Sequence, residues 1–292
     1  MKQHTLLIDG NSVAYTINIL NCKNAKDFSR QYFARIREYA KQFTTLVKCI
    51  IFFDDKRGNF REALYPNYQK GRKDARLKYT EMQKEESKKR SEYLKYLKEL
   101  IDKSPRFNYL HYSCTETDDL LALYVNNIQK EDEIVTILTT DKDLFQLIRN
   151  TGSKKVQVLF LIKRKLIKDE NIGKQALDKK IWLGDNSDSI PGVCKNVGEK
   201  NYEDFRIFVE KMNETHTDPT DKEKAKEISE SLNIRYIPSF SNFNQEQLDL
   251  NRKLIDLNYV VKLDKNNGNE KTEYLKNNID KAKISPYSLY NI

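Results

Sequence analysis

Short apolar runs alternate with stretches of helical spacing along the first 180 residues. The strand-like runs are Thr5–Ile8, Cys49–Phe53, Ile134–Leu138 and Val156–Ile162, with a weaker run at Tyr109–Tyr112. The helical stretches are Ser29–Thr44, Glu116–Gln129 and Lys142–Ile148. Continuous apolar runs are typical of strands buried on both faces. The alternation therefore predicts an α/β fold with a mostly parallel central sheet flanked by helices.

Three further regions depart from this alternation. Residues 66–104 are dominated by Lys, Arg and Glu and predict a long helical excursion from the sheet. Residues 212–230 predict a polar loop leading into a helix, and Asn244–Val261 has the apolar spacing of a helix. We therefore expect an α/β core over residues 1–180, with the excursion at about 66–104, and a helical region over 181–292.

The composition limits the chemistry and the partners. Lys and Arg number 52 against 43 Asp and Glu, so the net charge of +9 favours a polyanionic partner. Three histidines exclude a multi-histidine metal site, and four cysteines without CxxC spacing indicate a reduced, cytoplasmic protein. No apolar run approaches the ~20 residues of a membrane span, and the N-terminus lacks the apolar segment of a signal peptide, so we expect no membrane partner.

Carboxylates stand where the predicted strands end. Asp9, Asp54 and Asp141 follow three apolar runs, and the acidic segment Glu116–Asp119 follows the weaker one. In a parallel sheet the carboxyl ends of the strands share one edge, so these side chains should converge. Two carboxylates ~4 Å apart repel by about 4 kcal/mol at an effective dielectric constant near 20. Mg²⁺ or Mn²⁺ would remove that penalty, and paired metal ions hydrolyse phosphodiesters.

Each acidic motif also has an ordinary interpretation. Asp9-Gly10 could form a tight turn, and Asp141 could cap a helix. The acids at 116–119 could favour a helix dipole, and Asp185–Asp188 could belong to a polar loop. The occurrence of all four motifs in this order, after predicted strands, favours a shared site.

Six motifs resemble those of the 5′-nuclease family, which includes flap endonucleases, the 5′-3′ exonuclease domain of bacterial DNA polymerase I, and phage relatives. They are Ile8–Ser12, Phe53-Asp54, Tyr68–Arg72, Glu116–Asp119, Thr140–Leu144 and Gly184–Val193. The resemblance spans roughly residues 4–205 and implies a PIN-like nuclease core with a helical arch and a C-terminal helix-hairpin-helix. Asn251–Leu257 also resembles the last helix of the family. The lysine-rich interval and the C-terminal region are most similar to the RNase H of T-even phages, which removes RNA primers.

The resemblance implies roles for the acids and for the base of the arch. Two or more Mg²⁺ ions are expected, with Mn²⁺ as a substitute. The ligands of the first ion would be Asp9, Asp54, Glu116 and Asp118, and those of the second Asp141, Asp143, Asp185 and Asp188, with Asp119 bridging or holding waters. Lys70 and Arg72, with Lys73 as the alternative, would reach the scissile phosphate. The basic stretch that includes Arg76 would bind phosphates, although a charged stretch can also be a solvated helix face.

The resemblance also implies two contacts with nucleic acid. Tyr15 matches the aromatic residue on which the family stacks a terminal base, and its alternative interpretation is a core tyrosine. The hairpin would hold a duplex without reading its sequence. Its predicted DNA-binding residues are Gly192, Val193, Lys195, Gly198 and Lys200. This hairpin has one residue more than the family pattern, and Asn196 replaces a glycine, which puts the potassium ion that many members hold there in doubt.

These features together predict a metal-dependent 5′-nuclease that acts in DNA replication. The expected partner is a DNA or RNA–DNA duplex with a 5′ flap, nick or end, together with a single-strand-binding protein or a sliding clamp. One alternative is a PIN-type ribonuclease, which is usually much shorter and lacks the arch and hairpin. The other is a catalytically inactive DNA-binding relative, which would gain nothing from negative charge near phosphates.

Overall fold

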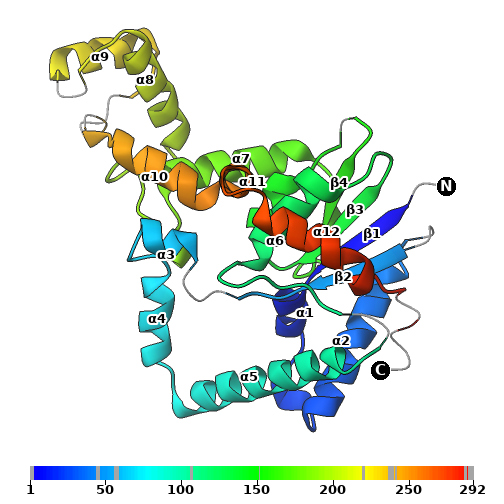
Figure 1. Ribbon diagram of the computed structural model, residues 1–292. Coiled ribbons are helices and arrows are strands. Elements are labelled where there is room, and N and C mark those ends of the chain that lie inside the picture. Colours follow the sequence, from blue (N-terminus) through cyan, green and yellow to red (C-terminus); the bar gives the residue numbers. More distant parts are fainter. Residues whose placement is uncertain are drawn as a thin grey trace. The chain divides into compact units, whose positions relative to one another are not determined.

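The computed structural model describes residues 3–43, 47–55, 59–105, 108–150, 152–218, 221–235, 240, 242–285 and 288. Its centre is a five-stranded sheet of order β2-β1-β3-β4-β5 (Figure 1). The strands are β1 (His4–Asp9), β2 (Val47–Phe52), β3 (Ile134–Thr139), β4 (Lys155–Phe160) and β5 (Lys165–Ile167). The first four are parallel, and β5 pairs antiparallel with β4. The predicted mostly parallel sheet is confirmed, and β5 is an addition that the sequence pattern did not indicate.

Helices cover both faces of the sheet, because successive side chains of a strand point to opposite faces. Leu6 and Ile8 pack with residues of α1 (Gly10–Tyr15), α2 (Ala25–Ala40) and α5 (Glu81–Asp102). Leu7 packs on the other face with residues of α6 (Thr117–Leu123), α11 (Leu257–Asn266) and α12 (Glu270–Ala282). Helices from the C-terminal part of the chain therefore complete the core of the sheet.

Several predicted elements differ in extent or type. The predicted strand Tyr109–Tyr112 makes only an isolated bridge between Leu110 and Phe52. The predicted helix Lys142–Ile148 is the 3₁₀ helix η3 (Asp143–Leu147), and Glu116–Gln129 divides into α6 and a π-helical turn, η2 (Tyr124–Ile128). Short helices of these types are common at element ends and functional sites.

Two predicted helices end where local backbone signals interrupt them. The stretch predicted over Ser29–Thr44 is α2, which starts earlier because the Asn24 side chain caps it by accepting from Asp27 N. It ends at Ala40, and Thr44 lies outside the described residues. The stretch Asn244–Val261 is two helices, α10 (Gln245–Ile255) and α11, because Asp256 is extended.

The predicted excursion at 66–104 is helical. It contains α4 (Lys70–Leu77) and α5, and α3 (Phe60–Leu64) precedes it. A capping box between Thr80 and Gln83 starts α5. The C-terminal half of α5 is anchored in the core by Leu97 and Ile101, whereas its first residues are exposed.

The chain folds into two compact units that differ from the predicted ranges 1–180 and 181–292. The first unit contains residues 1–60, 78–174 and 257–292, and the second contains 61–77 and 175–256. The difference arises because α11 and α12 pack on the sheet, while the residues at the start of the predicted excursion pack with the second unit.

The second unit has its own aromatic core, in which Trp182, Phe205 and Phe240 pack together. Its helices are the C-terminal part of α7 (Glu170–Leu183), α8 (Tyr202–Glu214), α9 (Lys222–Ser231) and α10, with α4 and the short η4 (Asn186–Asp188). The polar loop predicted from residue 212 onwards begins later, because α8 continues to Glu214, and the helix predicted after it is α9. Among the described residues, no helix has both the length and the apolar character needed to cross a membrane.

Candidate metal and nucleic-acid site

Asp9 links the end of β1 to the start of α1. Its carboxylate caps the helix by accepting from Ser12 N at 3.0 Å and from Ser12 Oγ at 2.5 Å. It also accepts from Thr139 Oγ1 at 2.9 Å. Burial raises the pKa of Asp9 to about 6, the charge of Asp54 adds to the increase, and the hydrogen bonds oppose it. The cap and the metal-ligand interpretations of this residue are thus compatible.

The pKa of Asp118 is affected by several neighbouring acids. Burial raises the pKa of this half-buried carboxyl well above its usual value. Negative charge on four neighbouring groups adds to the effect, and these are Asp141, Asp9, Asp54 and Glu116. In the first unit, acids at or just after the ends of β1, β2 and β3 therefore act on the same carboxyl as Glu116, which precedes α6.

Hydrogen bonds orient several of these groups. Asp54 accepts from the side-chain amide of Asn11 and from Thr117 N, the latter at 2.8 Å. Asp141 N donates to Thr139 Oγ1, and Asp143 N donates to Asp141 Oδ1 at 2.8 Å. The acidic edge is held by the first turns of α1, α6 and η3.

The donor set fits hard divalent cations. All the converging side chains offer carboxylate oxygens, and their mutual repulsion requires a compensating charge. Lys98 faces Asp54, but burial lowers the pKa of this lysine against the effect of the nearby carboxylates. Asp119 follows Asp118 in sequence, and its side chain has no exposed surface.

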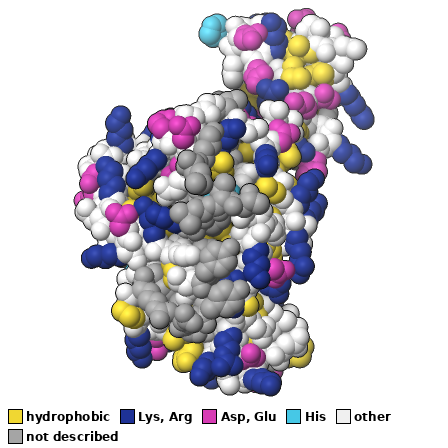
Figure 2. Space-filling model, turned by 90° about the vertical axis from the view of Figure 1, so that its right-hand side faces the viewer, with side chains coloured by type: hydrophobic (Ala, Val, Ile, Leu, Met, Phe, Trp, Pro, Cys, Tyr) yellow, Lys and Arg dark blue, Asp and Glu magenta, His cyan; other side chains and the backbone are white. Residues whose placement is uncertain are grey.

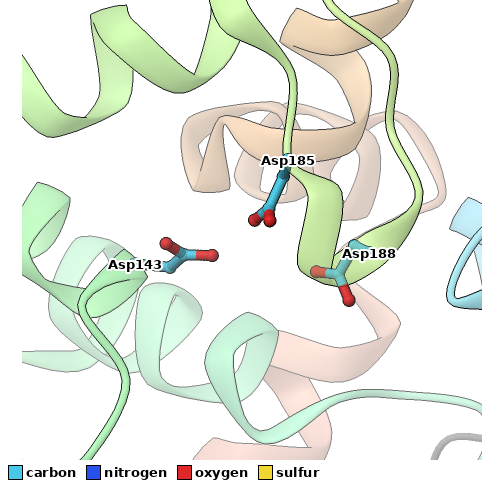
Figure 3. A group of neighbouring side chains, drawn as sticks. All are labelled: Asp143, Asp185 and Asp188. Carbon is cyan, nitrogen blue, oxygen red and sulfur yellow. The ribbon is translucent and has the colours of Figure 1, made fainter. Parts of the chain in front are cut away.

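The second unit carries two more predicted ligands on one short turn. Asp185 caps η4 by accepting from Ser187 N at 2.9 Å, and Lys180 Nζ lies 2.6 Å from its other oxygen. Burial opposes ionisation, but the hydrogen bonds from Lys180 and Ser187 hold the pKa of Asp185 below its usual value. Figure 3 shows the side chains of Asp185 and Asp188 on this turn.

Asp188 binds the segment at the base of the predicted arch. Arg72 Nη2 lies 2.8 Å from Asp188 Oδ1, and Arg72 Nε donates to Ser187 O at 2.9 Å. The backbone amides of Gln69 and Gly71 donate to Asp188 O and Ser189 Oγ. Two motifs more than a hundred residues apart in sequence thus form one structure within the second unit.

The other predicted phosphate ligands lie on or next to α4. Lys70 and Arg76 are exposed, and Lys73 pairs with Glu62 at 3.1 Å. In the first unit, the Tyr15 side chain is 63% exposed, with the Arg90 guanidinium 5.0 Å from the ring centroid. The interpretation of Tyr15 as a core residue is therefore wrong.

The hairpin between α7 and α8 turns at Asn196, whose φ is 63°. This is the conformation for which asparagine replaces glycine at the lowest cost. Lys195, Gly198 and Lys200 are exposed, and Gly192 is half-buried. Val193 does not fit the predicted contact with DNA, because its side chain is buried and its amide donates to Trp182 O at 3.0 Å.

The sequence interpretation assigned no role to the residues that hold the acids. Thr139, Ser12 and Lys180 each bond a predicted ligand. Ser12 stands three residues after Asp9, a spacing that signals a helix cap. No comparable local signal marks Thr139, because its partner lies on another strand.

Comparisons with known proteins agree with this geometry. Residues 4–181 match the family model described as 5′-3′ exonuclease, N-terminal resolvase-like domain. The thermostable DNA polymerase I of Thermus aquaticus is 31% identical over 212 residues, which cover 68% of this chain and 23% of the polymerase. The 5′-3′ exonuclease of Mycoplasma pneumoniae is 27% identical over 217 residues, covering 68% of this chain and 69% of that protein. The chain therefore spans about a quarter of the length of the polymerases it matches.

Solved structures share the fold. The phage T5 5′-exonuclease with bound zinc has a TM-score of 0.70 and 21% identity, covering 96% of this chain and 99% of that chain. A phage T5 flap endonuclease in a complex with DNA and metal ions has a TM-score of 0.71, with the same identity and coverage. The α/β architecture is therefore shared over nearly the whole chain.

Proposed function

The chain belongs to the family of 5′-3′ exonuclease N-terminal resolvase-like domains, and on that premise we propose that it is a metal-dependent 5′-nuclease. It hydrolyses phosphodiesters near the 5′ end of branched or nicked duplexes during DNA replication. The observation that carries the proposal is the group of four carboxylates around Asp118 at the carboxyl edge of the sheet. Neither a fold nor a basic surface alone requires such a cluster, whereas phosphodiester hydrolysis by metal ions does.

We propose Mg²⁺ as the metal, with Mn²⁺ as a substitute. Asp9, Asp54, Glu116 and Asp118 would hold one ion. Asp141, Asp143, Asp185 and Asp188 would hold another, with Asp119 supporting them. Bound divalent ions lower the pKa of water and offset the charge that develops on a phosphate during hydrolysis. Ser12 and Thr139 orient the carboxylate of Asp9 by hydrogen bonds. Lys180 pairs with Asp185 and balances its negative charge before any ion binds.

The basic residues would bind the nucleic acid. Exposed Lys70 would contact the scissile phosphate, and Arg76 a phosphate further along the strand. Arg72 is paired with Asp188, so its contribution would be to position the η4 turn as well as to bind phosphate. Exposed Lys195 and Lys200 of the hairpin would bind the duplex. A 5′ strand of RNA is included among the proposed substrates, because the lysine-rich interval and the C-terminal region resemble the RNase H of T-even phages, which removes RNA primers.

The test is a cleavage assay on a 5′-labelled flap duplex in Mg²⁺, with the full chain. The wild-type protein should release short products from the 5′ end. Asp141→Asn should lower the single-turnover rate by more than about a hundredfold while binding in Ca²⁺ persists. Asp280→Asn is the matched control, because Asp280 pairs with Lys283 on the exposed side of α12 and should leave the rate unchanged.

Three other outcomes would contradict the proposal. Cleavage of single-stranded RNA alone would favour the PIN-type ribonuclease. Flap binding without cleavage in either metal would indicate an inactive DNA-binding relative. Asp141→Asn activity above about a tenth of the wild-type rate would show that the acidic edge does not act through metal.

A further inference from the structure

The first unit contains a cavity of about 410 Å³ that none of the predicted site carboxylates lines. Its volume falls within the range of roughly 300–1,000 Å³ that is typical of sites for small ligands. The wall is built from the end of α1, the C-terminal half of α2, the residue after β3, and the turn between β4 and β5. The lining residues that matter here are Tyr15, Arg35, Tyr39, Thr140, Ile162 and Arg164.

Two arginines from distant elements, Arg35 of α2 and Arg164 of the turn between β4 and β5, line the same cavity as Tyr39. Burial raises the pKa of Tyr39, and the positive charges of Arg35 and Arg164 both oppose this increase. Arg35 also pairs with Glu38 at 3.2 Å, one turn along α2. Planar guanidinium donors arranged around a hydroxyl match the acceptors of a phosphate group.

The turn that supplies Arg164 is exposed. Its residues 162–165 read Ile-Lys-Arg-Lys, and of its two central cations only Arg164 lines the cavity. Arg164 has φ of 49°, a conformation that costs a non-glycine residue energy and persists where the surroundings or the function require it. The turn is held by the pairing of Phe160 with Lys165 and by Arg164 N donating to Leu161 O at 3.3 Å.

Two exposed apolar side chains line the cavity. Ile162 is 68% exposed and Tyr15 is 63% exposed. Apolar and aromatic side chains beside cations form the platforms on which unpaired bases rest. Lys and Arg side chains are spread over the face of the molecule in Figure 2, with acidic side chains among them.

One wall of the cavity is shared with the acidic edge. Thr140 precedes Asp141 in sequence, and its hydroxyl lies 2.9 Å from Ser12 Oγ. Ser12 in turn donates to Asp9. A group bound in the cavity would therefore lie one layer of side chains away from the carboxylates.

We propose that this cavity binds one nucleotide of the substrate, with its phosphate between Arg35 and Arg164 and its base against Ile162. The identity of the ligand as nucleic acid rests on the proposed function. The site uses residues other than those of the hairpin and of the base of the arch, and it includes Tyr15, which the sequence already indicated as a nucleic-acid contact.

The experiment is a titration of the full chain with a fluorescent 5′-flap duplex in Ca²⁺. Arg35→Gln and Arg164→Gln should each weaken binding by roughly five- to tenfold, the effect of one lost phosphate contact. Lys163→Gln is the matched control, because Lys163 carries the same charge on the same turn but does not line the cavity. Its effect should stay below about twofold. The double variant Arg35→Gln/Arg164→Gln should lose less than the product of the two single effects, since both side chains hold one phosphate.

A second arm locates that phosphate. Single phosphates of the duplex are replaced in turn by neutral methylphosphonates. At one position the replacement should weaken wild-type binding, have a smaller effect on Arg164→Gln, and have no further effect on the double variant. The proposal would be overturned if Lys163→Gln and Arg164→Gln lost equal amounts of binding affinity. It would also be overturned if the effect of the methylphosphonate and the effect of Arg164→Gln multiplied at every position of the duplex. Failure of the proposed function is distinguishable, because it would appear as absent flap cleavage by the wild-type protein.

Discussion

Thr139 donates its hydroxyl to Asp9 at 2.9 Å, so the end of β3 orients a carboxylate that β1 carries. The same hydroxyl accepts from Asp141 N. One uncharged side chain thus connects residues assigned to both proposed metal ions.

Replacing this hydroxyl should weaken metal binding. In Thr139→Val the pKa of Asp9 should rise above about 6, because the hydrogen bond from Thr139 lowers it. The metal concentration that gives half-maximal cleavage at neutral pH should increase about tenfold, as for other residues that orient metal ligands. Thr139→Ser, which keeps the donor, serves as the control. Identical metal dependence in the valine variant and the wild type would remove Thr139 from this role.

The metal-free protein should lose stability as the pH rises from about 4 to about 6. The pKa of Asp9 is 3.8 in the unfolded chain and about 6 in the fold. The folded state therefore binds the proton more tightly, and the stabilisation present below pH 4 is lost as pH rises through 6. Two pKa units correspond to about 3 kcal/mol. Thermal unfolding in the presence of a chelator should show that the stability of the wild type falls relative to that of Asp9→Asn over this pH range. Adding a divalent metal above pH 6 should restore the stability of the wild type. Parallel curves for the two proteins would contradict the assignment.

A methyl group at Gly10 should destabilise the fold. A Cβ there would lie 2.5 Å from the Phe53 ring and 2.7 Å from the Phe52 carbonyl oxygen. We expect Gly10→Ala to lower the free energy of unfolding by about 1–3 kcal/mol. Gly198 is the matched position, because no atom lies within 4 Å of a Cβ built there. Gly198→Ala should change the free energy by less than about 1 kcal/mol. Urea unfolding measures both, and equal losses would disprove the close approach at Gly10.

Two exposed cations near the base of the arch should separate catalysis from binding. Lys70→Ala should lower the single-turnover rate by about a hundredfold, because a cation beside the developing phosphate charge stabilises the transition state. Arg76→Ala should weaken binding by about 1 kcal/mol and reduce its salt dependence by about one ion. Rates at saturating enzyme and binding in Ca²⁺ measure the two effects. Equal, small effects would leave the solvated-face interpretation of this stretch standing.

The hairpin should not discriminate between monovalent cations. The extra residue and the turn at Asn196 alter the carbonyl geometry that potassium coordination requires, and exposed Lys195 offers a fixed charge instead. Duplex affinity in matched KCl and LiCl should be the same, and Lys195→Ala should weaken it by about 1 kcal/mol. Several-fold tighter binding in KCl would show that an ion site is retained.

The sequence was sufficient for the four parallel strands and for most of the acidic edge, but it missed β5 and predicted a strand at Tyr109–Tyr112 that makes only an isolated bridge. Runs such as Ile134–Leu138 are buried on both faces, which identifies them as strands of a parallel sheet. An acid that follows such a strand lies at the carboxyl edge of the sheet. The sequence therefore predicted the positions of Asp9, Asp54 and Asp141. The contact of Arg72 with Asp188 and the placement of Arg35 and Arg164 around one cavity depend on pairing between distant segments. Such contacts leave no periodic signal in the chain. The packing of α11 and α12 on the sheet was missed for the same reason.

The position of α11 and α12 has a consequence for the order of folding during synthesis. Leu7 and Ile50 belong to strands that are made early, yet the apolar cluster that covers them includes Val260, Leu275 and Ile279. The sheet face that carries them is covered only in part, by α6, until the ribosome has made Leu257–Ala282, whereas most of the second unit is complete before that point. A chain halted after residue 256 should retain helices but expose an aggregation-prone sheet.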